Sequence, residues 1–359
     1  MTSRTIVTGA ILVVAATPTR AQLPNPADDN RLVRVMTRNL YHGVDAQIFD
    51  VPNATTVPDL LNKVAAVYNG YFTSNFAERA EAVAAEIEAT RPDLIGLQEA
   101  ILVRTQFPPD GGATLASDVA LDYLQILLDA LAERGLRYDV AVQTHAFDFE
   151  LPSALGFDVR HTDREVILAR ADLSPGSLKL SNAQSGAFAV NCAIPTTLLG
   201  PITIQRNWVS VDAKIRGASL RFLSTHLDGD CLPVTSSIQR AQARELLAGP
   251  AATEVPTVLV GDLNSPADGT GDAYNDLISA GFSDVWPVAG NGAGLTCCQA
   301  DDLLNVASIL DRRIDLILFR GGLATIEAVI VGDDASRRTA SGLWPSDHAG
   351  VTATLAVLK

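Results

Sequence analysis

A short motif that carries an acid and an amide follows a strongly apolar segment near residue 260. The run 257–260 leads into Gly261-Asp262-Leu263-Asn264-Ser265 and then into a loop rich in Pro, Gly and Asp. Asp262 and Asn264 are two positions apart, so on an extended chain they project from the same face. A carboxylate can orient a water molecule or a metal ion, and an amide can donate to a phosphoryl oxygen. The motif therefore indicates phosphate chemistry, although the same residue types also form ordinary turns after strands.

Other reactive side chains also stand where apolar segments begin or end. Glu99 follows one such segment and His226 ends another, whereas Asp315 begins a third. The tripeptide Ser346-Asp347-His348 precedes the last apolar segment of the chain. Each group has a structural alternative, respectively a turn cap, a core histidine, an ion-pair partner and a polar turn. Their occurrence together and in this order favours a shared site.

The apolar pattern predicts the elements that must position these groups. Residues 76–90 have the spacing of an amphipathic helix, and Arg91-Pro92 ends it. A further helix is expected at 236–248. The expected strands are 33–39, 94–98, 137–143, 164–170, 205–214, 218–226, 257–262, 314–319 and 349–357. The expected long loops, which in compact domains often form functional rims, are 104–116, 144–163, 265–275, 287–300 and 332–346.

One more helix is predicted in the region that follows residue 116. Ser117 is a suitable N-cap, and Gly135 is a suitable residue for the end of the helix. The side chains expected on its buried face are Leu121, Leu124, Leu128 and Leu131.

The first residues have the features of an export signal. Arg4 supplies a positive charge, residues 6–16 are apolar, and Thr19-Arg20-Ala21 places small residues before a cleavage at Gln22. The apolar run is too short to span a bilayer, and no later run is long enough, so no stable membrane anchor is expected. We predict a secreted or periplasmic protein with a signal peptide at 1–21 and a flexible tail at 22–32.

Composition limits the partners. The chain of 359 residues is 47% hydrophobic and 19% charged, as in globular proteins, and its formal net charge is -14. Such a surface does not attract polyanions or an anionic membrane in bulk, so a nucleic acid would have to be held locally or through divalent cations. The sequence does not identify a protein partner.

Four cysteines are compatible with disulfides in an oxidising compartment. Cys192 and Cys231 each stand in a loop beside an expected strand, so a bond between them is the preferred pairing. Cys297 and Cys298 are adjacent and either bond to each other or pair elsewhere. Zinc binding is disfavoured because the chain has no CxxC pair here and no nearby histidine.

Together these motifs resemble the endonuclease/exonuclease/phosphatase superfamily, which contains DNase I-like nucleases, neutral sphingomyelinases and inositol-polyphosphate 5-phosphatases. The matching segments are Thr37-Arg38-Asn39-Leu40, Pro92-Asp93-Leu94-Ile95-Gly96-Leu97-Gln98-Glu99, Ser224-Thr225-His226-Leu227, Gly261-Asp262-Leu263-Asn264-Ser265, Arg313-Ile314-Asp315 and Ser346-Asp347-His348. The resemblance implies an α/β fold, a four-layer sandwich of two packed mixed β-sheets flanked by helices. It also implies a single domain over 33–359 with its active site at one rim of the sandwich.

The resemblance further implies a metal site. Glu99 would be the main ligand, with Asn39 beside it and Asp347 closing the site. The expected ion is Mg²⁺, with Mn²⁺ or Ca²⁺ as alternatives, because a hard cation suits oxygen ligands.

Catalytic roles are implied in the same way. Asp262 would hold the attacking water and Asn264 would contact the phosphate. His348, oriented by Asp315, would act on the nucleophile or the phosphate, and His226 would share the acid–base work.

Tyr41 and His42, which follow Asn39, are candidates for lining the cleft. Other nearby residues are expected to have structural roles. Arg164, between Asp163 and Glu165, is expected in a surface ion pair, with contact to a phosphate as the alternative, and Trp208, near Arg206, is expected to pack. The histidines His145 and His161 are expected to be solvated in a loop.

The sequence therefore predicts a secreted, Mg²⁺-dependent phosphoric ester hydrolase. It would cleave a phosphodiester by in-line attack of an activated water, in a nuclease-like or sphingomyelinase-like manner. The substrate would be a nucleic acid, a phospholipid headgroup or a small phosphodiester, and the chain lacks the basic, aromatic-interleaved stripe that tracks nucleic acids. The alternatives are an inositol-phosphate-type phosphomonoesterase and a catalytically inactive binding module on the same fold.

Overall fold

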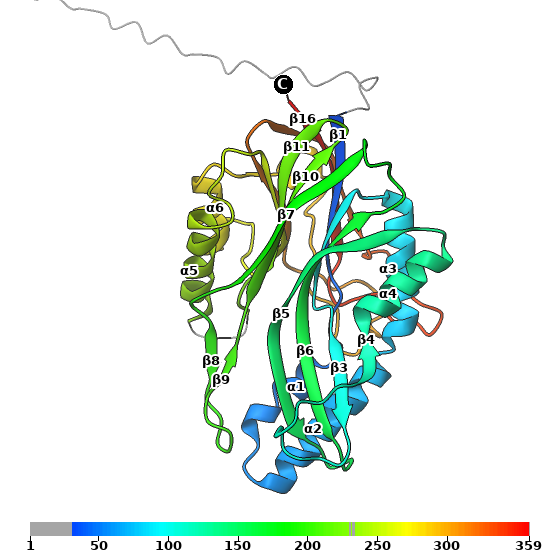
Figure 1. Cartoon of the computed structure of the whole chain (residues 1–359), viewed down its shortest axis with the longest axis vertical. Coiled ribbons are helices and arrows are strands. Elements are labelled where there is room, and N and C mark those ends of the chain that lie inside the picture. Colours follow the sequence, from blue (N-terminus) through cyan, green and yellow to red (C-terminus); the bar gives the residue numbers. More distant parts are fainter. Residues whose placement is uncertain (1–30, 230, 232–233, 359) are drawn as a thin grey trace, which may run out of the picture.

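Two mixed β-sheets pack face to face with helices on their outer sides, as expected (Figure 1). The structure is a computed structural model that describes residues 31–229, 231 and 234–358. The predicted signal peptide and residues 22–30 of the predicted tail lie outside the described residues.

The first sheet has eight strands in the order β15-β16-β1-β2-β6-β3-β4, with β5 paired to β6. The strands are β1 (Leu32–Asn39), β2 (Leu94–Gln98), β3 (Leu102–Gln106), β4 (Asp118–Asp122), β5 (Tyr138–Pro152), β6 (Asp158–Arg170), β15 (Leu323–Val331) and β16 (Gly350–Val357). Strands β1 and β2 are parallel, and Asn39 pairs with Gln98 at their carboxyl ends. This register places Asn39 and the residue after Gln98 at the same edge.

The second sheet has six strands in the order β13-β14-β12-β11-β10-β7. They are β7 (Leu178–Ala187), β10 (Asn207–Ile215), β11 (Ala218–His226), β12 (Thr257–Asp262), β13 (Ser283–Asp284) and β14 (Asp315–Arg320). A separate hairpin contains β8 (Cys192–Ile194) and β9 (Ile202–Ile204). A disulfide joins Cys192 to Cys231, the preferred pairing, and thereby links this hairpin to the segment after β11.

Helices cover the outer face of each sheet, and Figure 1 shows α3 and α4 on one side and α5 and α6 on the other. The helices are α1 (Asp45–Ile48), α2 (Val57–Thr73), α3 (Phe76–Thr90), α4 (Tyr123–Glu133), α5 (Thr235–Ala248), α6 (Asp272–Ser279) and α7 (Trp286–Ala289). Two 3₁₀ turns are η2 (Val51–Asn53) and η3 (Ala335–Arg337). Among the described residues no helix is both long and apolar enough to cross a membrane.

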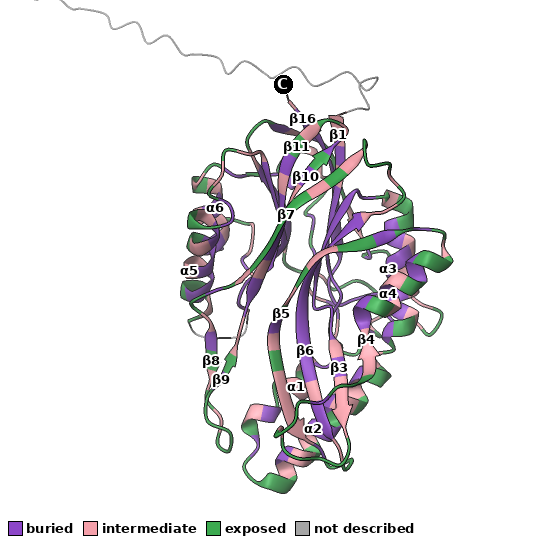
Figure 2. Ribbon diagram, in the orientation of Figure 1, coloured by how far each residue is buried: buried purple, intermediate pink, exposed green. Residues whose placement is uncertain are grey.

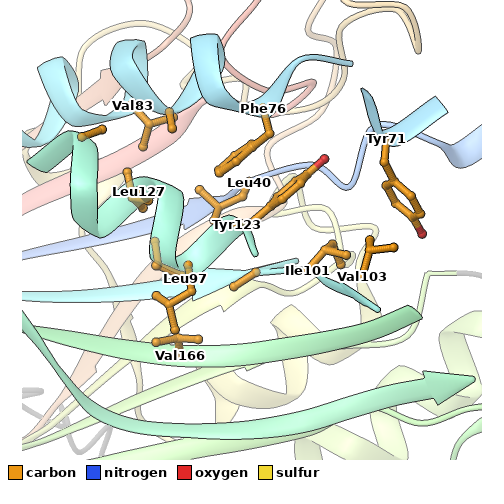
Figure 3. Close-up of a cluster of buried hydrophobic side chains, with 14 of the residues drawn as sticks. Leu40, Tyr71, Phe76, Val83, Leu97, Ile101, Val103, Tyr123, Leu127 and Val166 are labelled. Carbon is orange, nitrogen blue, oxygen red and sulfur yellow. The ribbon is translucent and has the colours of Figure 1, made fainter. Parts of the chain in front are cut away.

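Three apolar cores hold the layers together. One lies between the first sheet and its helices, and it contains Val83 of α3, Leu127 of α4 and Leu97 of β2 (Figure 3). The second lies between the two sheets, and the third lies between the second sheet and α5 and α6. Burial is therefore concentrated in the strands and in the inner faces of the helices (Figure 2).

The predicted helix start at Ser117 is wrong. Residues 118–122 form β4, which pairs antiparallel with β3, and the helix begins only at Tyr123. The side chain of Asp122 accepts a hydrogen bond from the backbone N–H of Gln125 and caps the helix in place of Ser117. Strand pairing has overridden the local helical pattern.

The predicted loop at 144–163 is also wrong, because β5 runs on to Pro152 and β6 starts at Asp158. The two strands form a long antiparallel hairpin, in which Glu150 pairs with Arg160. His161, expected to be solvated, is 8% exposed on β6, and its Nδ1 lies 2.5 Å from the hydroxyl of Tyr71.

Candidate functional site

The parallel ends of β1 and β2 bring an amide next to a carboxylate. Asn39 ends β1 and Glu99 directly follows β2, and Asn39 Nδ2 donates to Glu99 Oε1 at 2.9 Å. The other carboxylate oxygen of Glu99 accepts the backbone N–H of His42 at 2.8 Å. Asn39 Oδ1 accepts the backbone N–H of Tyr41, so its amide group is fixed on both sides. The contacts of Asn39 orient Glu99.

In the second sheet, strand register aligns three further groups. His226 pairs with Asp262 across β11 and β12, and Asp262 pairs with Asp315 across β12 and β14. Asn264 Nδ2 lies 3.1 Å from His226 Nε2, and the backbone N–H of Asn264 donates to Asp262 Oδ1. Gly261 permits this alignment, because a Cβ built at its φ of +151° would lie 1.9 Å from the carbonyl oxygen of Thr225.

Asp262 connects the two sheets. Its Oδ2 atom lies 3.2 Å from Asn39 Nδ2 of the first sheet and 3.5 Å from His226 Nε2 of its own sheet. The same atom lies 3.7 Å from Nε2 of His348, which precedes β16. The structure thus brings all eight predicted site residues to one end of the sandwich, where Glu99, His226, Asp262, Asn264, Asp347 and His348 line a single cavity. Asn39 and Asp315 are buried behind that lining.

Burial of several acids at one place shifts their ionisation. Burial raises the pKa of Asp347 to about 8, and the negative charges of Asp45 and Glu99 add to the shift. The pKa of Asp262 rises to about 6 through burial and the neighbouring Asp315. Such repulsion between buried carboxylates is what a bound cation would relieve.

The two histidines at the cavity have opposite environments. Burial lowers the pKa of His226 well below its usual value, and the positive Arg206 lowers it further. For His348 burial acts in the same direction, but Asp315, Asp347 and Asp262 outweigh it and raise the pKa well above its usual value. These surroundings favour the neutral form of His226 and the protonated form of His348.

The residues present fit a hard divalent cation. Glu99 and Asp347 offer carboxylate oxygens to the cavity from two sides, and hard cations prefer such ligands. Asp262, Asp315 and His348 also have ligand atoms within 4.8 Å of one another. In this second group, however, Asp315 and His348 are already engaged with each other at 2.7 Å. Glu99 and Asp347 are the better candidates for ligands.

His42, a candidate for lining the cleft, also contacts Glu99. His42 Nε2 lies 3.6 Å from Glu99 Oε2 and 2.9 Å from Asp45 Oδ1. Burial would lower the pKa of His42, but Glu99 and Asp45 together raise it to about 10. His42 is therefore a second positive group at the cavity. The only signal in the sequence was its place shortly after Asn39.

Behind His226 lies a charged group that comes from β6 and from the residue just before β10. Arg206 Nη1 is 3.1 Å from His226 Nδ1, and Glu165 Oε1 is 4.0 Å from the same nitrogen. Burial is the main reason why the pKa of Asp163 rises to about 6. Asp163 and Glu165 are two positions apart on β6, and this alternation was the signal in the sequence.

Arg164 forms an ion pair, as predicted, but the prediction that this pair lies on the surface is wrong. Arg164 is 4% exposed, pairs with Asp122, and donates to the backbone oxygens of Ala100 and Ile101. It therefore fixes the segment immediately after Glu99.

The remaining wall near His348 carries the second cysteine pair. Cys297 and Cys298 form a disulfide with each other, and both line the cavity. Cys298 Sγ is 3.9 Å from His348 Nε2. The whole cavity has a volume of about 230 Å³.

A family model described as "Endonuclease/Exonuclease/phosphatase family" matches residues 66–348. The chain belongs to this family. It is thus a member of the phosphoesterase superfamily that its strand-end motifs resemble. No curated protein matches the sequence of this endonuclease/exonuclease/phosphatase family member.

Solved structures of the family are similar to the chain in fold. A family protein from Bacteroides thetaiotaomicron has a TM-score of 0.57 at 16% identity, with 91% of this chain and 98% of that chain covered. A mannosyl-6-phosphatase from the same organism has a TM-score of 0.56 at 15% identity, covering 90% and 99%. D. rerio TDP2, complexed with a single-strand DNA product, has a TM-score of 0.53 at 17% identity, covering 91% and 99%.

Proposed function

We propose that the protein is an exported, divalent-metal-dependent phosphodiesterase. The observation that carries this proposal is the position of Asp262, whose Oδ2 atom stands between the imidazoles of His226 and His348 at 3.5 and 3.7 Å. A carboxylate in this position can orient a water molecule and accept its proton. The protonated imidazole beside it can donate a hydrogen bond to the phosphate.

Each side chain has a defined part in this proposal. Asp262 orients the attacking water, which would approach phosphorus in line with the leaving oxygen. The imidazolium of His348, fixed by Asp315 at Nδ1, directs Nε2 toward the phosphoryl oxygens. The amide of Asn264, beside His226, donates to the phosphate in place of its present contacts.

Glu99 and Asp347 would hold the metal ion, with Asn39 and His42 orienting Glu99. The ion, Mg²⁺ by its preference for oxygen ligands, would offset the charge that develops on the phosphoryl oxygens. The charge balance supports this assignment, because Glu99, Asp347 and Asp45 all line the cavity, where burial and then the charges of Asp45 and Glu99 raise the pKa of Asp347.

Export and domain organisation belong to the same proposal. Residues 1–21 would direct secretion or periplasmic export, and residues 33–359 would form the single catalytic domain. The Cys192–Cys231 disulfide supports this location, because such bonds persist in oxidising compartments.

The test is hydrolysis of bis-p-nitrophenyl phosphate by the purified protein with Mg²⁺ or Mn²⁺, compared with the same protein in EDTA. We expect metal-dependent release of p-nitrophenol, and we expect its loss in Asp262→Asn. Exposed Asp139, on β5, supplies a matched control as Asp139→Asn. Absence of turnover on any phosphoester, with metal supplied and the fold intact, would favour the inactive binding module.

A comparison with p-nitrophenyl phosphate separates the diesterase from the monoesterase. A preference for this monoester would replace our proposal with the phosphomonoesterase alternative. The structural neighbours include a protein named as a mannosyl-6-phosphatase and TDP2 complexed with a single-strand DNA product, so both alternatives are worth testing.

A further inference from the structure

One side of the catalytic cavity is apolar, and we call this side the apolar lobe. Three parts of the chain form it: the α1–η2–α2 segment, the β5–β6 hairpin and the β8–β9 hairpin. Its apolar side chains are Ile48, Phe49, Val51, Pro52, Val64, Val67, Phe147, Phe149, Leu151, Val159, Ile194, Ile202 and Ile204. Figure 1 shows α1 and α2 at the same end of the molecule as the halves of β5 and β6 that adjoin their connecting turn.

The lobe is a packed surface of the fold. Val51, Val64, Val67, Val159 and Ile202 are each at most 8% exposed, although they border an open cavity. An apolar wall that remains accessible from a polar centre is suited to an apolar part of a ligand.

The cationic side chains that line the cavity already have partners, and His42 is held by Asp45 and Glu99. Within the described part of the chain, the arginines that line it are Arg206, which contacts His226, and Arg312, which contacts Cys297 and Cys298. No lysine occurs among the described residues that line the cavity. A second phosphate next to the scissile one would therefore lose water in the lobe and would gain a cationic partner only by displacing these contacts.

Strand alternation explains how β5 builds this wall. Phe147, Phe149 and Leu151 project from one face and line the cavity, whereas Asp148 and Glu150 project from the other. Asp148 pairs there with Arg160 of β6, so the register of the hairpin is fixed by charges outside the cavity.

We propose that the apolar lobe binds an alkyl or aryl group esterified to the scissile phosphate. This inference rests on the proposed phosphodiesterase activity and specifies its substrate: a phosphodiester with one apolar substituent in place of a continuing chain of phosphates. Each methylene group that enters the lobe should raise kcat/KM about fourfold until the lobe is filled.

Alkyl p-nitrophenyl phosphodiesters test the proposal, because the leaving group is constant while the alkyl group grows from methyl to hexyl. Rates are measured with Mg²⁺ or Mn²⁺ at substrate concentrations below micelle formation. The hexyl ester has five more methylene groups than the methyl ester, so we expect kcat/KM to rise by about 10³-fold if all five enter the lobe and by more than about tenfold if only two do.

Variants locate the effect. Phe149→Ser should bring the hexyl-to-methyl ratio of kcat/KM close to one, and the conservative Phe149→Leu should restore most of it. Phe107, which is 81% exposed and does not line the cavity, provides the control Phe107→Ser, in which the ratio stays at the wild-type value. Circular dichroism verifies that each variant is folded.

The outcomes separate this inference from the function on which it rests. Metal-dependent hydrolysis of all the esters at one common kcat/KM would overturn the lobe assignment and leave the phosphodiesterase intact. Faster hydrolysis of a dinucleotide than of the hexyl ester would overturn it as well. Failure to cleave any ester, the methyl ester included, would overturn the proposed function and this inference together.

Discussion

The Nδ1 atom of His348 lies 2.7 Å from the Oδ2 atom of Asp315, although the two residues come from different sheets. Asp315 is the first residue of β14, and His348 stands just before β16. The contact fixes the imidazole ring and directs Nε2 toward Asp262. The packing of the two sheets thus determines the geometry of the candidate site.

Replacement of His348 by alanine should reduce turnover by about 10²–10⁴-fold, the usual contribution of a positioned acid–base group. The cause would be loss of the protonated imidazole that faces Asp262. Steady-state hydrolysis of bis-p-nitrophenyl phosphate measures the effect, and exposed His145 on β5 provides the control His145→Ala. Full activity in His348→Ala would show that our role for this residue is wrong.

Replacement of Glu99 by glutamine should weaken metal binding first. We expect the Mg²⁺ concentration that gives half-maximal rate to rise roughly 10–100-fold, because an amide is a poorer ligand for a hard cation. A Mg²⁺ titration of the rate measures this, with Glu133→Gln on the exposed side of α4 as the control. An unchanged Mg²⁺ requirement would remove Glu99 from the metal site.

Acid should destabilise the protein through His161. Burial, aided by the positive His42, lowers the pKa of His161 to about 3. The unfolded chain therefore binds a proton below pH 6.5 that the folded chain does not, so the stability contribution is complete above pH 6.5 and is lost as pH falls toward 3. Lowering the pH from 7.5 to 5.0 should therefore reduce the free energy of unfolding by about 2 kcal/mol through this residue.

In the variant His161→Gln this position cannot titrate. The difference in unfolding free energy between the variant and the wild type should therefore change by about 2 kcal/mol between pH 7.5 and 5.0. Urea unfolding at both pH values measures the two free energies. Parallel pH dependence in the wild type and the variant would mean that His161 is not the group responsible.

Two neighbouring leucines of α4 should differ in their contribution to stability. Leu127 is fully buried in the core beneath α3, whereas Leu128 is only half-buried. Leu127→Ala should lower the free energy of unfolding by about 2–5 kcal/mol, and Leu128→Ala should lower it by less than half as much. Denaturant unfolding compares them, and equal losses would contradict the observed packing.

The fold class could be predicted from the sequence, as could the strands that carry the candidate site. An apolar run leads to Glu99 in 94–98 and to Asp262 in 257–262, and the more mixed segment 218–226 ends in His226; the observed strands have those bounds. A buried central strand has apolar side chains on both faces, so its end is a sharp boundary in the sequence.

The β5–β6 hairpin could not be located in this way, although a signal was present. Phe147-Asp148-Phe149-Glu150-Leu151 alternates as a half-buried strand does, but Gly, Pro and Asp in the surrounding segment indicated a loop. The predicted helix start failed for a similar reason, because residues 118–122 pair with a strand that local spacing does not reveal.

The roles of His42 and Arg206 depend on contacts between distant parts of the chain. His42 acts on Glu99, 57 positions later, and Arg206 acts on His226 in the neighbouring strand. Neither residue ends an apolar run, so its type and position alone do not distinguish it from a surface charge.

The closeness of Gly261 to the backbone of Thr225 makes position 261 intolerant of every other amino acid. Even alanine would force β11 and β12 apart at their ends, where one strand holds His226 and the other holds Asp262. The damage would be a misalignment of two reactive groups by a residue that contacts no substrate. A survey of substitutions in this chain should therefore find an activity-critical position with no side chain of its own.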